Sequence, residues 1–321
     1  MISLRRLGSS DLVVSSIALG CWPIAGVTSL DVNADDSLKT LHSALDAGIN
    51  FLDAAYSYGV DGESETLIGQ ATQGRRDKVV IATKGGLHRV GKGQAHDARP
   101  KTLLRECDES LQRLQTDVID LYYLHAPDPT VPVAESAGAI QHMIDSGKVR
   151  FAGASNMKTS QLDEFHAACP ITAVQPHYNM LQREIEADIV PWCLQHNIGL
   201  CVYWPLMKGL LAGRLPRDHQ FVDADGRKKY PMFQGEEWQK NQDFMDDMKA
   251  IAADVGCSVS QLVLAWTICQ PGISSALCGA KRAWQIKETA AAMQLELMDD
   301  TLTKIAAALE KRGQPYSIAA V

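Results

Sequence analysis

The sequence predicts an α/β protein of the (β/α)8, or TIM-barrel, class. Eight short runs rich in Val, Ile and Leu recur along the 321 residues, and amphipathic helical patterns separate most of them. The composition, with 46% hydrophobic and 21% charged residues, is that of an ordinary globular protein. Although 321 residues exceed the usual domain length, α/β barrels commonly reach this size. We therefore expect residues 1–321 to form a single barrel domain.

The eight apolar runs are the expected strands. They are SIALG from residue 16, NFLD from 50, VVIATK from 79, VIDLYYLH from 118, VRFAGAS from 149, TAVQ from 172, GLCVYW from 199 and SSALCG from 274. Continuous apolar character is typical of parallel strands that are buried on both faces, and eight such strands can close into a barrel. An open, doubly wound sheet is the competing architecture.

Between these runs, apolar residues recur at the three- and four-residue spacing of amphipathic helices. They are Leu38, Leu41 and Leu45; Leu104, Cys107, Leu111 and Leu114; Val133, Ala137, Ile140 and Ile144; and Leu162, Phe165 and Cys169. Pro100 and Pro132 stand where two of the helices should begin, and Gly48 and Gly147 stand just past two expected helix ends. Strand and helix therefore alternate along the chain.

Two segments depart from this alternation. Residues 3–15, SLRRLGSSDLVVS, alternate around a Gly-Ser-Ser turn, which predicts an N-terminal β-hairpin that covers the bottom of the barrel. From about Leu215 to Asp247 the chain is polar, contains prolines and glycines, and is much longer than a typical connection between a strand and a helix. We expect this long loop after the seventh strand to serve function at the top face.

Neither of two common nucleotide-binding motifs is complete. The fingerprint G-x-G-x-x-G, which an open dinucleotide-binding sheet would carry after an early strand, is absent. Residues 86–93, GLHRVGKG, match G-x-x-x-x-G-K, but Gly93 stands at the Ser/Thr position and no helical pattern begins there. We therefore do not expect a nucleoside triphosphatase.

Charge and spacing exclude several other classes. A net charge of −7 gives no reason to expect a nucleic-acid partner. No apolar run approaches the ~20 residues of a membrane span, and the first residues lack a secretory signal, so we expect a cytoplasmic protein. The eight cysteines form no C-x-x-C pair and are expected to be reduced core thiols. The histidines lack metal-ligand spacing, which argues for metal-free chemistry, and nothing indicates an oligomeric state.

Polar residues close several of the expected strands. In a parallel barrel the active site lies at the C-terminal ends of the strands, and these ends carry Asp53 with Tyr58 five residues later, then Lys84 and His125. Each residue alone has an ordinary structural explanation, such as a turn cap, a surface cation or a core histidine. All four together predict one catalytic pocket.

This set is suited to transferring a proton to a carbonyl oxygen. A phenol has a pKa near ~10 and acts as a general acid at neutral pH; we expect Lys84 to bring the pKa of Tyr58 closer to neutral and Asp53 to keep the lysine charged. His125 would hold the carbonyl oxygen by a hydrogen bond. No nucleophile stands beside a base and no carboxylate pair suggests glycoside hydrolysis. A hydride from a cofactor would complete the reaction.

The segments that carry these residues resemble the aldo-keto reductase family, from about residue 3 to residue 310. GINFLDAAYSYGVDGESETLIGQA is similar to the aspartate-to-tyrosine segment of that family, VVIATKGG to its lysine strand and DVIDLYYLHAPDP to its histidine strand. The resemblance implies a (β/α)8 barrel without a Rossmann domain, a catalytic tetrad of Asp53, Tyr58, Lys84 and His125, and a nicotinamide dinucleotide as cofactor.

The resemblance also implies a set of cofactor contacts. Ser155 and Asn156 of GKVRFAGASN, with Gln175, would bind the nicotinamide carboxamide, and Tyr203 would stack on the nicotinamide ring. The following loop would wrap the pyrophosphate through Pro205, Leu206, Gly209 and Leu211, with Arg214 as its cation. The segment CGAKRAWQIKETAAA would bind the adenosine through Gly279, Lys281, Gln285 and Glu288. Lys281 is the expected partner of a 2′-phosphate, which favours NADPH.

Three positions differ from the common family pattern. Ala54 stands where many members have threonine, Trp204 replaces a small residue after the stacking aromatic, and Thr289 replaces an asparagine that often contacts adenine. For the substrate, the expected walls are Trp22, Tyr56, His88, Pro127 and the long loop.

The function implied is an NADPH-dependent oxidoreductase that reduces an aldehyde or ketone, with Tyr58 as the proton donor. The partner would be a small carbonyl compound. Two alternatives stay open: an NAD-linked dehydrogenase acting on a sugar, and a cofactor-sensing binding module like the relatives that associate with membrane channels.

Overall fold

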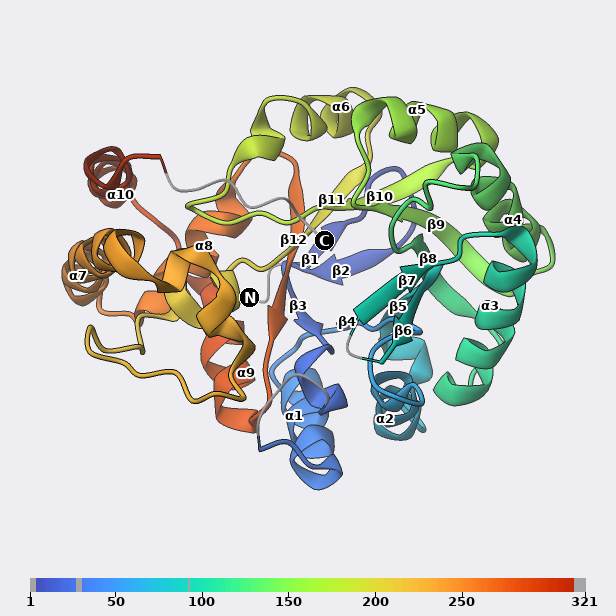
Figure 1. The fold of residues 1–321 in the computed structure, drawn as a ribbon, viewed down its shortest axis with the longest axis horizontal. Helices are drawn as coiled ribbons and strands as arrows, with labels where there is room; N and C mark the ends of the chain where they lie inside the picture. Colours follow the sequence, from blue (N-terminus) through green and yellow to red (C-terminus); the bar gives the residue numbers. More distant parts are fainter. Residues whose placement is uncertain (1–3, 27–30, 92, 315–321) are drawn as a thin grey trace.

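Eight parallel strands form a closed barrel at the centre of the molecule (Figure 1). The computed structural model describes residues 4–26, 31–91 and 93–314. In chain order the barrel strands are β3 (Ile17–Gly20), β4 (Phe51–Asp53), β5 (Val80–Gly85), β8 (Ile119–Leu124), β9 (Val149–Ser155), β10 (Ile171–Gln175), β11 (Gly199–Tyr203) and β12 (Ile273–Gly279). All eight expected strands are therefore confirmed. The open-sheet alternative is wrong, because β12 pairs with β3 from Ala276 and Ile17 to Gly279 and Gly20.

Helices surround the barrel in Figure 1. They are α1 (Ala34–Asp46), α2 (Glu63–Ala71), α3 (Pro100–Leu114), α4 (Val133–Asp145), α5 (Thr159–Ala168), α6 (Ile189–Gln195), α7 (Gly235–Val255), α8 (Val259–Cys269), α9 (Ala283–Ala290) and α10 (Asp299–Arg312). The local signals agree: Pro100 is the first residue of α3, and the Asn33 side chain caps α1 by accepting from the Asp36 N–H.

The expected N-terminal hairpin closes the bottom of the barrel. It consists of β1 (Leu4–Arg6) and β2 (Val13–Ser15), paired antiparallel. Leu7, Leu12 and Val14 are buried in the same apolar cluster as the inward-facing strand residues Phe51, Leu121 and Tyr123. At ~1.5 to 3 kcal/mol for each large apolar side chain removed from water, these contacts hold the hairpin in place. Gly8 has a φ of +56°, and a Cβ there would lie 2.8 Å from the carbonyl oxygens of Thr172 and Asn197, so only glycine fits.

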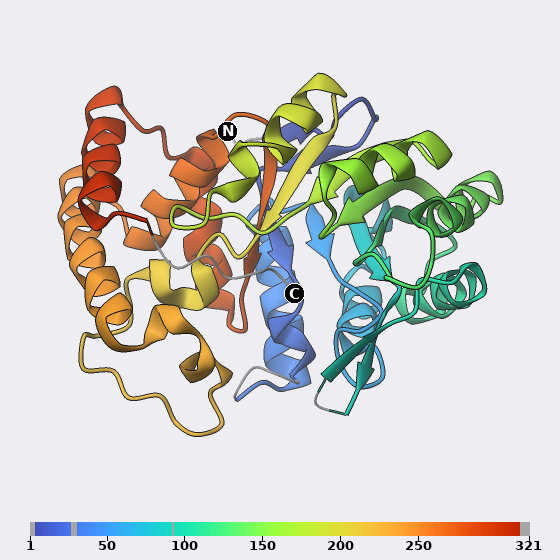
Figure 2. The ribbon, with the colours of Figure 1, turned by 45° about the horizontal axis from the view of Figure 1, so that its top comes forward.

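A second hairpin, which the sequence did not predict, follows β5. It is formed by β6 (Leu87–Val90) and β7 (Gly93–His96), and Figure 2 shows it in teal, extending away from the barrel. It occupies the segment that resembles a phosphate-binding loop; Lys92 of that segment lies outside the described residues. The hairpin confirms that no helix begins at this glycine-rich turn.

The long connection after β11 is confirmed, but its second half is not a loop. Short 3-10 turns cover Met207–Ala212, Gly226–Lys229 and Pro231–Phe233, and from Gly235 the chain is the helix α7. Aromatic rings give the connection a small core of its own: the ring of Phe233 lies 5.3 Å from that of Phe221 and 6.1 Å from that of Trp238, centroid to centroid. The polar composition of this segment concealed that core.

Two further findings concern the chain as a whole. All eight cysteines are free, six are buried, Cys257 is half-buried and Cys269 is exposed. In the described part of the chain, no single helix is long and apolar enough to cross a membrane; α7 and α8 meet the length and composition test only as a pair, and they are bent by 89°.

Candidate active site

The four predicted catalytic residues meet at the C-terminal rim of three neighbouring strands. Asp53 ends β4, Lys84 lies near the end of β5 and His125 directly follows β8, while Tyr58 comes from the connection between β4 and α2. The backbone N–H of Tyr56 donates to the Lys84 carbonyl at 2.9 Å, which ties this connection to β5. The topology thus assembles the set that the strand ends predicted.

Lys84 is the centre of the cluster. Its Nζ atom donates to the Oδ2 atom of Asp53 at 2.6 Å, to the carbonyl oxygen of Ala54 at 2.6 Å and to the hydroxyl oxygen of Tyr58 at 3.1 Å. The side chain is fully buried, so an ammonium is stable there only because three oxygens surround it. Burial alone would lower the pKa of Lys84, but the Asp53 carboxylate and the Tyr58 hydroxyl outweigh it and raise that pKa. Lys84 therefore stays charged.

The pKa of Tyr58 lies above its ordinary value. Burial of the phenol raises this pKa more than the Lys84 ammonium lowers it, and the Asp53 carboxylate adds to the rise. Lys84 lowers the pKa of Tyr58, as expected, but burial outweighs this effect, so the expectation that the pKa of Tyr58 moves closer to neutral is wrong. Lys84 instead limits the upward shift that burial causes, and the phenol is protonated at neutral pH, which is the form of a proton donor.

His125 is held beside Tyr58 as a neutral imidazole. The two rings lie 5.8 Å apart, edge to face. Burial, and then the charges of Lys84 and His96, lower the pKa of His125 well below its ordinary value. Its Nδ1 atom is buried and has no hydrogen-bond partner among the described residues.

The predicted nicotinamide contacts form a connected network next to the tetrad. The Gln175 amide donates to the Oδ1 atom of Asp53 at 2.8 Å, and Ser155 Oγ donates to the Gln175 carbonyl at 2.8 Å. The Asn156 amide donates to the His125 carbonyl at 3.0 Å, and its Oδ1 atom accepts from the Tyr203 hydroxyl at 2.8 Å. Asn156 has a φ of +58°, a strained conformation that these bonds hold in place.

The predicted pyrophosphate loop follows Tyr203. Pro205 and Leu211 are buried and Leu206 is half-buried. The N–H groups of Gly209 and Leu211 donate to the Leu206 carbonyl at 2.8 and 3.2 Å, so these two amides already have a partner within the loop. The expectation that they are available to a phosphate is not supported by this conformation.

Arg214, the predicted cation of that loop, is bound to α9 instead. Its guanidinium donates to the Oε2 atom of Glu288 at 2.5 Å and lies over the Trp284 ring at 4.6 Å. The structure thus joins two of the predicted cofactor residues to each other, across the space between the loop and α9.

The remaining adenosine residues lie at the end of β12 and the start of α9. Gly279 faces Pro23, whose Cγ atom would lie 2.8 Å from an added Cβ. The Gln285 side chain accepts from the backbone N–H of Lys281 at 2.9 Å and so shapes this turn. Arg282 points toward α1, where it pairs with Asp36 at 3.5 Å and donates to the Asp31 carbonyl at 2.6 Å. Thr289 is buried and donates to its own helix, so its hydroxyl does not face the turn.

The predicted substrate residues divide into two groups. Trp22 lies at the tetrad, with its ring 4.9 Å from that of Tyr58. Tyr56 and His88 are instead held by α3: the Tyr56 hydroxyl donates to Glu109 at 2.6 Å, and His88 Nδ1 lies 3.0 Å from Glu106 Oε1. Their rings lie 6.0 Å apart, so they form a small cluster between α3 and the β6–β7 hairpin, to which His88 belongs.

Glu106 and Lys208 were not predicted. Glu106 is fully buried, accepts from the Gly86 N–H at 2.7 Å, and has a pKa that burial raises to about 8. The Lys208 ammonium lies over the rings of Trp204 and Tyr230. Glu106 lies at a core-facing position of α3, where a carboxylate is unusual. A charged residue at such a position of the helical pattern is the one feature of the sequence that could have indicated it.

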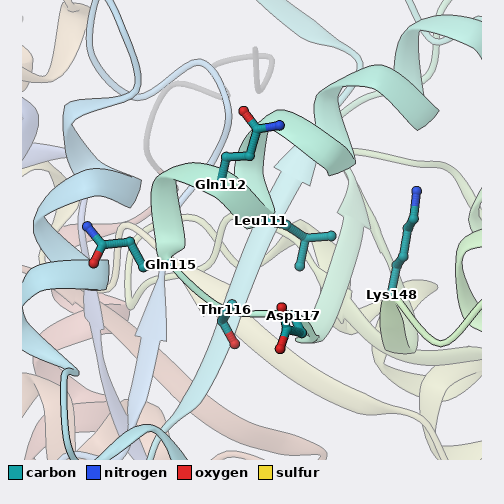
Figure 3. Close-up of a pocket in the computed structure, with 6 residues that line it drawn as sticks. All are labelled: Leu111, Gln112, Gln115, Thr116, Asp117 and Lys148. Atoms are coloured by element: carbon teal, nitrogen blue, oxygen red, sulfur yellow. The ribbon is translucent and has the colours of Figure 1, made fainter.

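Two surface cavities lie away from the tetrad. One, of about 380 Å³, is lined by residues around the C-terminal end of α3: Leu111, Gln112, Gln115, Thr116, Asp117 and Lys148 (Figure 3). The other, of about 260 Å³, lies by the N-terminal hairpin and includes Asp11, Arg76, Asp120 and Arg150. Asp120 there accepts from Arg76 and Arg150 at 2.7 and 3.0 Å, an ion-pair network at the bottom of the barrel. No cluster of metal-ligating side chains is found in the described ranges.

Comparison with known proteins agrees with this architecture. The profile of the Aldo/keto reductase family matches residues 16–310. The aldo-keto reductase YhdN of Bacillus subtilis is 35% identical over 284 residues, which are 88% of this chain and 86% of that protein. The structure of glycerol dehydrogenase AKR11B4 from Gluconobacter oxydans superposes with a TM-score of 0.91 at 33% identity, covering 99% of this chain and 98% of that one. For aldo-keto reductase AKR11C1 from Bacillus halodurans the TM-score is 0.79 at 24% identity, with 99% and 98% covered, a likeness of fold. The chain belongs to the aldo-keto reductase family, whose members are oxidoreductases that use nicotinamide cofactors.

Proposed function

We propose that this protein reduces an aldehyde or ketone to the alcohol with NADPH, and that Tyr58 donates the proton. The observation that carries the proposal is the contact of the buried Lys84 ammonium with the Tyr58 hydroxyl oxygen at 3.1 Å. A cation in that place stabilises the phenolate that forms when the proton leaves. Asp53, at 2.6 Å, keeps the ammonium charged and in position.

Proton transfer from Tyr58 to the substrate oxygen is favourable. The phenol holds its proton at neutral pH, because burial raises its pKa. An alkoxide is far more basic than a phenolate, since even water has a pKa of about 15.7, so the raised pKa of Tyr58 does not prevent the transfer. Positioned acids of this kind contribute ~10² to 10⁴ in rate.

His125 would orient the carbonyl group. The pKa of His125 lies well below its ordinary value, so the imidazole is neutral at neutral pH. A neutral imidazole still has one N–H group, which can donate a hydrogen bond to the carbonyl oxygen. With Trp22 beside Tyr58, His125 would place the carbonyl oxygen at the phenol. Proximity of this kind lowers the barrier because the orientation is set before the reaction.

The side chains around the tetrad fit a nicotinamide dinucleotide. Ser155, Asn156 and Gln175 supply the hydroxyl and amide groups that a carboxamide needs, and the half-buried Tyr203 supplies a ring for stacking. When bound, the cofactor supplies the hydride. A carboxamide would have to share or replace the bonds that now join Asn156, His125 and Tyr203.

The preference for NADPH rests on Lys281. This residue lies in the turn between β12 and α9, where a 2′-phosphate could meet the ammonium and the start of a helix. The neighbouring Arg282 would contribute little, since its guanidinium is engaged with Asp36 and Asp31.

One observation favours a second function, the oxidation of a polyol. The structure of a glycerol dehydrogenase superposes with a TM-score of 0.91 at 33% identity. The same four residues would serve the reverse reaction, in which the hydride of the alcohol would pass to the oxidised cofactor and the Tyr58 oxygen, as a phenolate, would accept the hydroxyl proton. Because the pKa of Tyr58 is raised, more of this phenolate would be present at higher pH, and we expect oxidation to be faster there.

A turnover screen tests these proposals. The purified protein is assayed with simple aldehydes, ketones, sugars and glycerol, in both directions, with NADPH and NADH in parallel. We expect reduction of aldehydes with NADPH to be fastest. Faster polyol oxidation with NAD would favour the second function, and dinucleotide binding without any turnover would instead support a binding module.

A further inference from the structure

The backbone of the loop after β11 is unusual. Seven non-glycine residues of the described chain have a positive φ, and three of them, Trp204, Met207 and Lys208, stand within five positions, with φ values of +59°, +44° and +55°. Residues with a Cβ atom rarely adopt a positive φ, because the Cβ atom crowds the backbone. Such residues persist where the surrounding structure holds them, and they are common at functional sites. Here it places the Lys208 side chain between two aromatic rings.

Trp204 and Tyr230 enclose the Lys208 ammonium. Its Nζ atom lies 3.6 Å from the centroid of the Trp204 ring and 4.5 Å from that of Tyr230, which comes from the long connection after the loop. Such cation–π contacts are stronger when water is partly excluded, and Lys208 is half-buried. The contact with Lys208 gives a structural role to Trp204, which departs from the family pattern.

No acidic side chain of the described residues pairs with Lys208, although other cations near the loop and the adjoining turn are paired. Arg214 binds Glu288, Arg227 binds Asp225 at 2.7 Å, and Arg282 binds Asp36. Burial, and then the charge of Lys229, lower the pKa of Lys208 to about 8. A half-buried ammonium without a counterion is unfavourable, and an arriving anion would remove that cost.

The position of Lys208 indicates which anion. Tyr203, the predicted nicotinamide-stacking residue, touches Trp204 edge to face at 5.4 Å, and Trp204 in turn contacts Lys208. The pyrophosphate of a dinucleotide lies between its nicotinamide and adenosine halves, so it must cross this loop if both ends bind as proposed. The amides of Gly209 and Leu211 donate within the loop, and Arg214 is bound to Glu288.

We propose that Lys208 is the pyrophosphate-binding cation of this site and that Trp204 and Tyr230 hold its side chain for that role. The proposal rests on the proposed dinucleotide site and reassigns the cation from Arg214. It also gives the long connection a function, since Tyr230 belongs to it. An ammonium held by two rings binds a phosphate oxygen with less loss of side-chain entropy than a free lysine would.

The test measures binding and not turnover. Dissociation constants of NADPH, NADH, ADP and adenosine are determined by calorimetry for the wild type, Lys208→Met and Lys208→Arg, with Lys229→Met as the matched control. Lys229 is exposed and also contacts Tyr230, with its Nζ atom 5.2 Å from the centroid of that ring. We expect Lys208→Met to weaken NADPH, NADH and ADP alike, by about tenfold to a hundredfold, and to leave adenosine unchanged. Lys208→Arg and Lys229→Met should stay within about threefold of the wild type.

Each other outcome decides the matter. Unchanged affinity in Lys208→Met, or an equal loss in Lys229→Met, overturns the proposal, because either result assigns the phosphate to other groups. If Lys208→Met does not fold, Lys208→Gln replaces it in the same comparison. If Lys208→Met weakens NADPH binding but the wild type reduces no carbonyl compound, only the proposed function is refuted. If the wild type reduces carbonyl compounds but Lys208→Met binds NADPH as tightly as the wild type, only this inference is refuted.

Discussion

The Nζ atom of Lys84 lies 3.1 Å from the hydroxyl oxygen of Tyr58, and it also lies 4.7 Å from the centroid of the Tyr58 ring. The ammonium therefore contacts the atom that would carry the negative charge after proton transfer. The Oδ2 atom of Asp53 and the Ala54 carbonyl oxygen also accept from this ammonium, each at 2.6 Å. In the proposed mechanism, Lys84 and Tyr58 would therefore act together.

Lys84→Met should lower carbonyl reduction by at least about a hundredfold, because the phenolate loses its cation. The change also leaves the Asp53 carboxylate buried without a charge partner, which costs about 3 to 5 kcal/mol in stability. Steady-state kinetics beside a thermal melt separate the two effects. A folded variant with near wild-type kcat would show that Lys84 does not assist the acid.

Tyr58→Phe should abolish reduction and leave cofactor affinity within about threefold, because the lost hydroxyl would act on the substrate oxygen. Fluorescence titration with NADPH measures the affinity, and steady-state assays measure the loss. Trp22→Phe, which alters the ring next to Tyr58 without removing the acid, measures how much activity is lost through changed packing alone, and this loss should be much smaller. Substantial activity in Tyr58→Phe would assign the proton to another group.

His125→Gln should retain more activity than His125→Ala, because glutamine keeps a hydrogen-bond donor near the carbonyl oxygen. Since the pKa of His125 lies well below its ordinary value, the wild-type rate should show no imidazole titration between about pH 6 and 8. A pH–rate profile for all three proteins checks both points. Equal losses in the two variants, with a titration near pH 6.5 in the wild type, would mean that His125 transfers a proton.

Lys281→Ala should weaken NADPH by about tenfold to a hundredfold and leave NADH within about twofold, since a charge-assisted bond to the 2′-phosphate is lost. Because Arg282 is engaged with α1, the single substitution suffices. Dissociation constants for both cofactors provide the measurement, and Lys287→Ala, an exposed lysine of α9, is the control. Parallel weakening of the two cofactors would place the phosphate elsewhere.

Between about pH 5 and 8, the free energy of unfolding should fall less in Glu106→Gln than in the wild type. The pKa of Glu106 is raised to about 8 in the folded protein, against an ordinary value near 4.3, so between these values the folded state binds the proton and the unfolded state does not. Stability from this group therefore falls as pH rises through that window. Glutamine keeps an acceptor for the Gly86 N–H but does not titrate.

Thermal melts at pH 5 and 8 compare Glu106→Gln with the wild type and with Glu135→Gln, an exposed control on α4. We expect the Tm difference between the two pH values to shrink by at least roughly 2 °C only in Glu106→Gln. The His125 pKa acts in the opposite sense in all three proteins, so it cancels in the comparison. A Tm difference that matches the wild type would mean that Glu106 does not titrate in this range.

The strands, and the meeting of four polar side chains at one rim, were readable from the sequence. Buried parallel strands need continuous apolar residues, so runs such as residues 79–84 and 118–125 stand out, and a polar residue that ends such a run must lie at the rim. Because all eight strands end at one rim, the position of Asp53, Lys84 and His125 along the chain was enough to place them together.

Pairwise contacts between distant segments were not readable in this way. The hairpin β6–β7 is stabilised by α3 residues such as Glu106, the core of the long connection depends on Phe221 meeting Trp238, and Arg214 binds Glu288 74 positions away. The direction of the Tyr58 pKa likewise depends on burial, which no local pattern reports. The sequence by itself determined the periodic order of buried strands and helices, because periodicity follows from backbone geometry; tertiary structure alone decided which charges find partners, because burial and pairing arise only when distant segments pack together.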